Sequence, residues 1–463
     1  MSLPFTTFIS RAFRELLMDS VPEAFVDETL GRLMHELLFP RWRDRWSGRP
    51  VLSHELLAEL EGQITALRGK RYNGRALLDR FQTQTGLHLE ITEADWLRGQ
   101  ARTAQLTLPP GLEAALSAEL RILHRERRDA PWVNFLNGQP AAKQQFAEQR
   151  TARRKARLQL SETPNVQLLN ATPLKAYARF APFFDQALEV ADSHTREGRR
   201  HANLRTLHVL SQLGLAPTYR TAIRSPRIYP VGYSMAQLSA NVRATLLATS
   251  YQCDLVGAQL AIIARLWTLP TWTSRLQAAQ KGGTALWPAL LRELGLPGDA
   301  KADLKMLVYA TAYGMSQINL RRVAAERLGA EATATLFRQP LMQELLAGRR
   351  ERRNRLQHEG GITDALGQKV TVEDRRQQQG RGGVGGSLLA HEAQSFELVL
   401  LEPVFDIARR SEGFRIPLWL HDGCYVTPRE DRAAQILRGL RDQVNRKAER
   451  LGIETQLEIT YCE

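Results

Sequence analysis

The segment PLWLHDGCYVTP at residues 417–428 constrains the fold more than any other part of the chain. Two short apolar runs flank a polar turn, which is the pattern of a β-hairpin with buried strands. Asp422 lies in this turn, and Asp254 ends a strand-like run, NVRATLLATSYQCDL, directly before a segment with helical spacing. Because a bare carboxylate is expensive to bury, each of these acids is expected to be paired or to bind metal.

Most of the remaining chain has the apolar spacing that is typical of helices. Residues 1 to about 165 and 266–350 predict one helix after another, as does LLAHEAQSFELVLLEPVFDIARR. Shorter runs predict a strand at TLHVLSQLGL, a hairpin at ITDALGQKVTV, a turn at SPRIYPVG and a loop at RRQQQGRGGVGG. A helix, DRAAQILRGLRDQVNRKAERLG, and a strand, ETQLEITY, close the chain. The expected fold class is therefore α+β and mostly helical.

The charge balance favours a polyanionic partner. The 463 residues include 63 Lys and Arg against 49 Asp and Glu, a net charge of +14, and such an excess favours nucleic acid or an anionic surface. Two basic clusters are either solvated helix faces or phosphate contacts. The first contains Arg125, Arg127 and Arg128, and the second Arg150, Arg153, Arg154, Lys155 and Arg157.

Cysteine content and hydropathy bear on the compartment. Three cysteines are too few and too scattered for a disulfide framework or a zinc site. No run approaches the roughly 20 apolar residues of a membrane span, and the N-terminus lacks a secretory signal. We therefore expect a soluble, cytoplasmic protein with no membrane partner.

Three segments, in this order along the chain, resemble the motifs of the family A DNA polymerases, the DNA polymerase I type. SYQCDLVGAQLAIIARL resembles motif A, in which an Asp ends a strand and begins DYSQIELR. KADLKMLVYATAYGMSQ resembles motif B, RxxxKxxxF/YGxxYG, and PLWLHDGCYV resembles motif C, VHDE. TLHVLSQLGLAPTYRTAIRSPRIYP is similar to RLHTxFxQxxTxTGRLSSxxPNLQNIP, and HEAQSFEL to NxPxQGTAADL. The resemblance covers about residues 200–463.

The resemblance implies a right-hand polymerase fold, in which the palm is an antiparallel sheet flanked by fingers and thumb. It implies an N-terminal helical region at residues 1–95 and a thumb-like helical region at 96–190. The palm would comprise residues 191–265 with motif A and 391–463 with motif C, and the fingers residues 266–390 with motif B. The chain leaves no room for a separate exonuclease domain, so proofreading is not expected.

Nucleotidyl transfer requires two divalent ions that clamp the attacking 3′ oxygen and the leaving pyrophosphate oxygen, and hard carboxylates hold such ions. Asp254 and Asp422 are the candidate catalytic and metal-binding residues, and the resemblance adds the backbone carbonyl of Leu255 as a ligand. The expected cofactor is a pair of Mg²⁺ ions, for which Mn²⁺ is a possible substitute.

Motif B predicts a stripe along one helix, because Lys301, Lys305, Tyr309 and Tyr313 recur every four residues. Two ammonium groups followed by two rings suit a triphosphate at one end and a base pair at the other. The resemblance makes Lys305 a catalytic residue and implies two binding sets. The nucleotide set is Lys301, Lys305, Tyr309 and Gln259, and the primer–template set is Arg220, Tyr313, Gly314, Gln394 and His421.

Three departures from the family pattern bear on substrate choice. The Glu of motif A, which sits under the sugar and excludes ribose, is Gln259 here, and the second acid of motif C is Gly423. The Arg at the head of motif B is Lys301, which keeps the charge but loses bidentate geometry. These changes leave the core chemistry in place and leave sugar selection open.

The predicted function is that of a DNA-directed DNA polymerase in repair or in the replication of a small element. It would extend a primer 3′ end with dNTPs by a two-metal mechanism, with DNA primer–template as its partner and with relaxed or altered sugar discrimination. One alternative is a single-subunit RNA polymerase or primase-like enzyme of the same superfamily. Another is a catalytically inactive nucleic-acid-binding protein that retains the fold.

Overall fold

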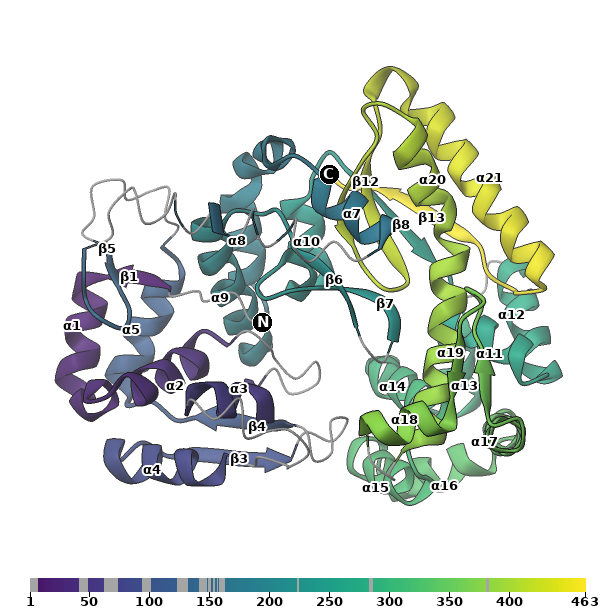
Figure 1. Cartoon of the computed structure of the whole chain (residues 1–463). Coiled ribbons are helices and arrows are strands. Elements are labelled where there is room, and N and C mark those ends of the chain that lie inside the picture. Colours follow the sequence, from purple (N-terminus) through teal and green to yellow (C-terminus); the bar gives the residue numbers. More distant parts are fainter. Residues whose placement is uncertain are drawn as a thin grey trace.

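The structure is a computed structural model that describes most of the chain (Figure 1). The described residues are 7–40, 49–61, 74–93, 101–122, 132–140, 148, 151–152, 155, 157, 163–222, 225–282, 286–379 and 383–463. Of the two basic clusters, Arg125, Arg127, Arg128, Arg150, Arg153 and Arg154 lie outside these residues. Arg157 is buried and donates to the carbonyls of Leu169 and Thr172, so it belongs neither to a solvated helix face nor to a set of phosphate contacts.

The N-terminal part of the chain combines helices with short strands. Its elements are β1 (Phe8–Ser10), α1 (Arg11–Ser20), η1 (Pro22–Phe25), α2 (Glu28–Leu38), β2 (Val51–Ser53), α3 (His54–Leu60), α4 (Arg75–Thr85), β3 (Leu89–Glu93), β4 (Ala101–Leu106), α5 (Pro110–Leu120) and β5 (Trp132–Asn134). The prediction that residues 1–165 are helical throughout is therefore wrong at five places. These strands have only three to six residues each, too few for an alternating pattern to be told from helical spacing.

The middle of the chain leads from helices into the first strands of the candidate site. It contains α7 (Pro164–Ala171), η4 (Leu174–Phe183), α8 (Phe184–Asp192), α9 (Glu197–Leu213), β6 (Tyr219–Ala222), β7 (Ser225–Pro230), η5 (Met235–Gln237), α10 (Ala240–Leu246) and β8 (Tyr251–Leu255).

Two predictions for this part are wrong, and a third is partly wrong. TLHVLSQLGL is mostly the end of α9, where Thr206 to Leu210 are all buried, so the apolar pattern shows neither a helical nor a strand period. SPRIYPVG forms β7, which pairs only with β6 among the described strands, and an edge strand tolerates Pro226 and Pro230. In NVRATLLATSYQCDL, only the last five residues are a strand, because α10 precedes it.

The described second half of the chain is helical apart from two hairpins and the last strand. Its first elements are α11 (Ala258–Leu266), α12 (Pro270–Gly282), α13 (Leu286–Glu293), η6 (Gly298–Ala300), α14 (Lys301–Ala312), α15 (Gln317–Leu328), α16 (Ala330–Arg338), α17 (Pro340–His358), β9 (Gly361–Thr363), β10 (Lys369–Thr371) and α18 (Val372–Gln379). They are followed by α19 (Val384–Leu400), α20 (Glu402–Arg410), β11 (Arg415–Trp419), β12 (Gly423–Thr427), η7 (Glu430–Arg432), α21 (Ala433–Leu451) and β13 (Leu457–Tyr461).

Most predictions for this half are confirmed. Hairpins form at β9–β10 and β11–β12, and the chain closes with α21 and β13. The long helix predicted from residue 388 divides into α19 and α20 at Leu401, and Pro403 lies in the first turn of the second helix. The predicted glycine-rich loop is shorter than expected, because Arg375 to Gln379 belong to α18; residues 380–382 lie outside the described residues.

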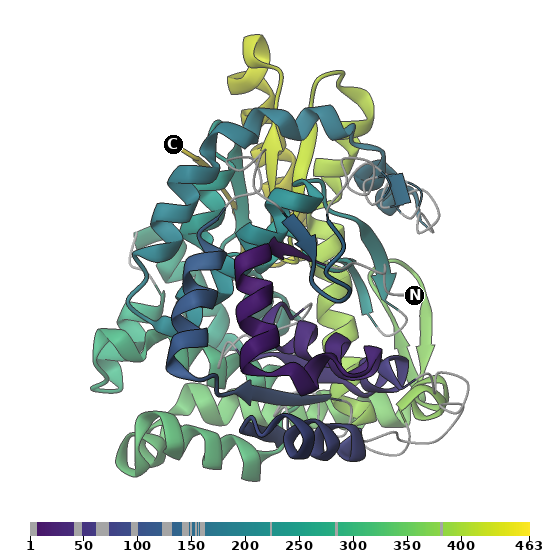
Figure 2. The same ribbon diagram turned by 90° about the vertical axis from the view of Figure 1, so that its left-hand side faces the viewer.

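A four-stranded antiparallel sheet stands between two hydrophobic clusters, and the strand order is β11-β12-β8-β13. Cys253, Leu255, Cys424 and Val426 belong to the cluster formed with α11 to α21. Tyr425 belongs to the cluster formed by the N-terminal part and α8 to α10. Figures 1 and 2 show the sheet in the upper part of the molecule and α15 to α17 in the lower part, with α19 running between them. The α+β fold class is thus confirmed.

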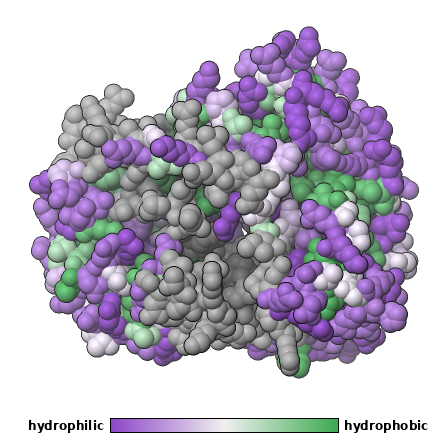
Figure 3. All heavy atoms as spheres, viewed as in Figure 1, coloured by the Kyte–Doolittle hydropathy of each residue, from purple (hydrophilic) through white to green (hydrophobic). Residues whose placement is uncertain are grey.

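The described surface is mainly polar. Hydrophilic side chains cover most of the described part of the face shown in Figure 3, with hydrophobic residues in smaller patches. No helix among the described residues is long and apolar enough to cross a bilayer.

A buried histidine connects the N-terminal strand to α9. Gln212 accepts from the backbone N–H of Phe8, and its Nε2 donates to the Phe8 carbonyl and to Nε2 of His208. Since His208 Nε2 accepts, the ring proton is on Nδ1, which lies 3.0 Å from the Ile122 carbonyl oxygen and donates to it. Burial lowers the pKa of His208, and nearby Glu119 only partly opposes this. The folded protein therefore holds this side chain neutral.

This arrangement predicts a loss of stability in mild acid. A depressed folded-state pKa stabilises the fold above the unfolded-state pKa of about 6.5 and ceases to do so as the pH falls. The free energy of unfolding should decrease below pH 6.5 by up to about 1.4 kcal/mol per pH unit from this residue. Chemical denaturation between pH 5 and 8 measures it. His208→Gln should flatten the profile, whereas His358→Gln on the exposed end of α17 should not; equal slopes for both variants would contradict the assignment.

Candidate active site

The pairing of β8 with β12 brings the two predicted aspartates together. Asp254 is opposite Gly423 in the ladder, and the backbone N–H of Leu255 donates to the Asp422 carbonyl at 3.0 Å. Leu420 N–H donates to the Gly423 carbonyl at 2.9 Å and closes the turn that carries His421 and Asp422. Asp422 is exposed, whereas Asp254 is partly buried. Two carboxylates from distant parts of the chain thus meet at one end of the sheet.

A chain of hydrogen bonds orients Asp254. Gln252, two residues earlier on the same face of β8, donates from Nε2 to the Asp254 carboxylate. The hydroxyl of Tyr425, opposite Gln252 on β12, donates to Gln252 Oε1 at 2.9 Å. Arg243 of α10 donates from Nε to the Tyr425 oxygen at 3.3 Å and is anchored by the Leu238 carbonyl at 3.0 Å. Sequence reasoning missed all three supporting residues, because the register that aligns them is not visible in the sequence.

The electrostatics of this sheet edge favour a bound cation. Burial raises the pKa of Asp254, and the hydrogen bond from Gln252 opposes the rise. Asp422 and Glu458 raise the pKa further, since each places negative charge near Asp254. Glu458 lies opposite Asp254 on β13 and is a third acid that sequence reasoning missed. The alternation of LEITY places Glu458 on the opposite face from Leu457 and Ile459, but only the register shows its neighbour.

Only glycine fits at position 423 without a shift of the neighbouring strand. A Cβ at position 423 would lie 2.2 Å from Oδ1 of Asp254 and 2.4 Å from the carbonyl oxygen of Cys253. Both distances are far below van der Waals contact, and Cys253 contributes backbone that cannot move without shifting β8. The absence of an acid at this position, noted in the sequence, therefore has a steric cause.

Gly423→Ala should displace Asp254 or separate β8 from β12. Overpacking of this kind lowers the free energy of unfolding by about 1–3 kcal/mol, which urea denaturation would measure. Gly439→Ala is the matched control, because a Cβ at position 439 in α21 meets no atom within 4 Å. An unchanged stability of Gly423→Ala would show that the strands relax at no cost.

The motif B residues lie on α14 and its C-terminal end, as the spacing predicts. Lys301 is exposed, and Lys305 and Tyr309 are partly buried. Both of the latter contact Trp287 of α13: the Lys305 ammonium lies 5.5 Å from the centre of a Trp287 ring, and the rings of Tyr309 and Trp287 are 5.8 Å apart. Trp287 therefore supports the side chains that were predicted to bind nucleotide, a role that no sequence signal indicated.

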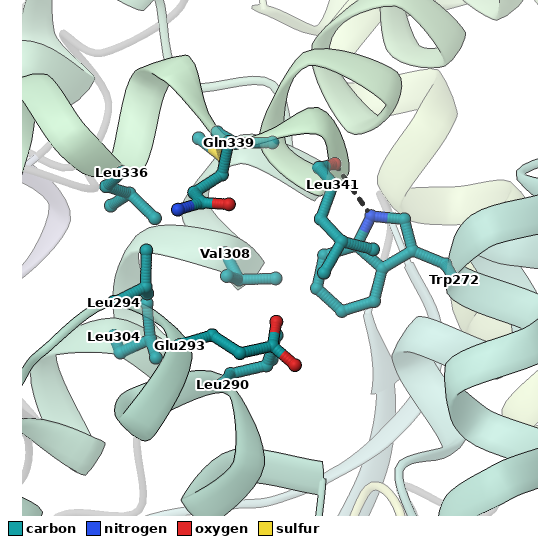
Figure 4. A pocket seen from close by; sticks show the side chains of 10 residues that line it. Trp272, Leu290, Glu293, Leu294, Leu304, Val308, Leu336, Gln339 and Leu341 are labelled. Atoms are coloured by element: carbon teal, nitrogen blue, oxygen red, sulfur yellow. Dashed lines mark hydrogen bonds between the residues drawn. The ribbon is translucent and has the colours of Figure 1, made fainter.

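An apolar pocket lies behind the same helix (Figure 4). Leu304 and Val308 of α14 line it together with Trp272, Leu290 and Leu341, and the Trp272 indole N–H donates to the Leu341 carbonyl at 2.9 Å. None of the predicted site residues lines this pocket. We therefore assign it to packing between the helices and not to the candidate site.

Two of the predicted primer–template residues, Gln394 and His421, each contact a residue of β7. Ser225 donates to Gln394 Oε1 at 2.6 Å, and the Tyr229 hydroxyl donates to Ser225 at 3.4 Å. The Tyr229 ring lies 4.7 Å from the ring of His421. Arg220, opposite Tyr229 on β6, is exposed. The β6–β7 hairpin thus connects α19 to the turn that carries the catalytic candidates.

Tyr313 and Gly314 lie at the end of α14. The Tyr313 hydroxyl accepts from Nη2 of Arg227 at 3.4 Å. Gly314 has φ +87°, and a Cβ there would lie 2.6 Å from the Cα of Gly386 at the start of α19. Gly314 therefore allows two helices to approach closely, a packing role that would apply whether or not this residue also lies near a template.

Gln259 lies on α11, five residues after Asp254, and its side chain is close enough to Glu397 of α19 to lower the pKa of that carboxyl group. Glu397 is buried and forms an ion pair with Arg227. Burial raises the pKa of Glu397 to about 7, although Arg227 opposes the rise, and the nearby charge of Asp422 adds to it. Gln259 thus lies near a buried acid that is itself close to Asp422.

The donors at the sheet edge fit a hard divalent ion. Carboxylate and backbone carbonyl oxygens are the ligands that Mg²⁺ prefers, and Asp254, Asp422 and the carbonyl of Leu255 offer such atoms. Among the described residues, the His, Cys, Asp and Glu side chains close enough for a three-ligand site are Glu113, Glu197 and His201, which lie on α5 and α9 and include none of the predicted ligands. This end of the sheet therefore offers two predicted side-chain ligands, and a bound ion would take its other ligands from backbone, substrate or water.

Comparison with known proteins gives matches among solved structures alone. No family model matches the sequence, and no curated protein matches it. A similar solved structure is the POL domain of Pol1 from M. smegmatis in complex with DNA primer–template and dNTP, which is 13% identical. The structural match covers 93% of this chain and 80% of the Pol1 chain, with a TM-score of 0.43. A similarity this low transfers no residue's role, so the roles below rest on the geometry and motifs of this chain.

Proposed function

We propose that this protein is a template-directed nucleotidyltransferase that extends a DNA primer with dNTPs and lacks proofreading. The observation that carries the proposal is the meeting of Asp254 and Asp422, which the β8–β12 register brings together from positions 168 residues apart (422 − 254). A second observation supports it. Arg227 donates hydrogen bonds to the Tyr313 hydroxyl, at the end of α14, and to the Glu397 carboxylate. The negative charge of Asp422 raises the pKa of Glu397.

In the proposed mechanism, Asp254, Asp422 and the Leu255 carbonyl would hold two Mg²⁺ ions. When bound, such ions lower the pKa of the attacking hydroxyl and neutralise charge on the leaving pyrophosphate. The hydrogen bond from Gln252 fixes the orientation of the Asp254 carboxylate at the end of the sheet. Lys301 and Lys305 would bind the triphosphate, with Lys305 neutralising charge that develops during transfer, and Tyr309 would support the nascent base pair.

The remaining residues would position the primer–template. Arg220 lies on β6, Gln394 and His421 contact residues of β7, and Tyr313 and Gly314 lie at the end of α14. The net charge of +14 supports binding to a phosphate backbone. We also propose the division into palm, fingers and thumb-like regions at the boundaries predicted above.

Asp254→Asn and Asp422→Asn should each reduce primer extension by at least about a thousandfold, because each removes a charge that would hold metal in the transition state. Extension of a labelled primer with Mg²⁺ measures the rate, and fluorescence anisotropy measures primer–template affinity. Affinity should change less than about threefold, since phosphate contacts dominate binding. Asp442→Asn on the exposed face of α21 is the control. Equal losses of affinity and rate would mean that the aspartates are structural.

A single-subunit RNA polymerase or primase-like activity is the second candidate. Gln259 and Gly423 favour it, because neither position has the acid of the family pattern and position 423 has no space for one.

Parallel primer-extension assays with dNTPs and rNTPs test both candidates. We expect efficient extension with dNTPs and measurable extension with rNTPs, because Gln259 replaces the acid that excludes ribose in the family. The ratio of kcat/KM for the two substrates is the measurement. Extension with rNTPs alone would contradict the DNA polymerase, and extension with neither would favour an inactive nucleic-acid-binding protein.

A further inference from the structure

A buried ion pair next to the aspartates has no role in the mechanism above. The Glu397 side chain is 1% exposed, and both of its oxygens accept from Arg227 of β7. Arg227 Nε lies 2.8 Å from Oε2, and Nη2 lies 2.9 Å from Oε1. A bidentate guanidinium–carboxylate pair fixes both groups in one orientation. Glu397 is therefore a rigidly oriented carboxyl group in the interior.

Three further segments lie next to this pair. The Gln259 side chain on α11 is close enough to Glu397 to lower its pKa, and Nη2 of Arg227 donates to the Tyr313 hydroxyl at the end of α14. Asp422 is near enough for its charge to act on Glu397. One buried carboxylate thus connects two residues predicted to bind substrate with one of the two candidate metal ligands.

The pair is not the sole contact between β7 and α19. Ser225, two residues before Arg227, already donates to Gln394, three residues before Glu397, at 2.6 Å. A buried ion pair is weak evidence for stability, because desolvation offsets much of its attraction. Its position points instead to a role in arranging the site.

Compared with the family motifs, this chain lacks an acid at position 259 and has an additional acid at position 397. Gln259 stands where the family motif has Glu, and Gly423 has no space for a side chain. In HEAQSFEL, aligned on Gln394 with the family segment QGTAADL, Glu397 stands where the motif has Ala. The added acid, Glu397, is near enough to Gln259 for Gln259 to lower its pKa.

We infer that Glu397 is a positioning residue of the nucleotide site, which takes the place of the acid missing at position 259 and, with Arg227, fixes Gln259 and Tyr313 beside Asp422. This inference rests on the proposed function and specifies how its nucleotide site is built. It makes two demands: neutralising Glu397 must weaken nucleotide binding, and moving the acid back to position 259 must restore it.

The first test compares Glu397→Gln with Glu392→Gln. Glu392 is the matched control, because it lies on the same helix, is 5% exposed and forms its own bidentate pair with Arg352. Loss of a charged hydrogen bond should raise the KM for dNTP by about tenfold or more in Glu397→Gln, with kcat changed less than about threefold. Glu392→Gln should leave KM within about twofold. Thermal unfolding of both variants reports any general destabilisation.

The second test is the exchange Gln259→Glu/Glu397→Gln. Gln259→Glu alone places two carboxylates in contact and should raise KM as well. The double variant again has one acid and one amide and should return KM to within about threefold of wild type. A wild-type KM for Glu397→Gln would overturn the inference, as would a double variant no better than the worse single one.

Titration of wild type with dATP and Mg²⁺ by calorimetry separates this inference from the proposed function. Wild-type protein that neither binds dATP nor extends a primer overturns both. Wild-type protein that extends a primer, with no change in dATP affinity or KM in Glu397→Gln, overturns this inference alone.

Discussion

The antiparallel pairing of β8 with β12 is the interaction on which the candidate site depends. It places Asp254 opposite Gly423 and leaves Asp422 at the adjoining turn. A slip of one residue would turn Asp254 to the other face of the sheet, where Cys253 and Leu255 are buried. Burial of these residues with Cys424 and Val426 therefore does more than stabilise the sheet, because it selects the one register in which the carboxylates meet.

Residues on the same face of the sheet as Asp254 orient its carboxylate. Arg243, Tyr425 and Gln252 form a relay that ends at the Asp254 carboxylate, and Tyr425 belongs to the hydrophobic cluster of the N-terminal part. Packing far from the reacting groups is thus transmitted to one carboxylate through three side chains. The same principle holds for Trp287, which supports Lys305 and Tyr309 from behind.

Local features of the sequence predicted the parts of the site that depend on local spacing. The hairpin around Asp422 was predictable because apolar runs flank a short polar turn, and the α14 stripe because its residues recur every four positions. The prediction failed where burial was uniform: the end of α9 is buried on nearly every side, so its residues show no helical period. Glu397 was missed for a related reason, since an acid inside a largely buried helix has no pattern of its own. Glu458 and Gln252 depend on strand register, which is a long-range property.

The crowding at Gly423 limits how this protein can change over evolutionary time. Any side chain at that position would meet the neighbouring strand, so a lineage that keeps this strand pairing cannot gain an acid there by a single replacement. Positions 259 and 397 have no such barrier, since Gln and Glu are nearly isosteric. Replacements at these two positions can therefore exchange an acid on α11 for one on α19 while β12 remains unchanged. Homologues of this chain should vary at those two positions together and keep glycine after the turn.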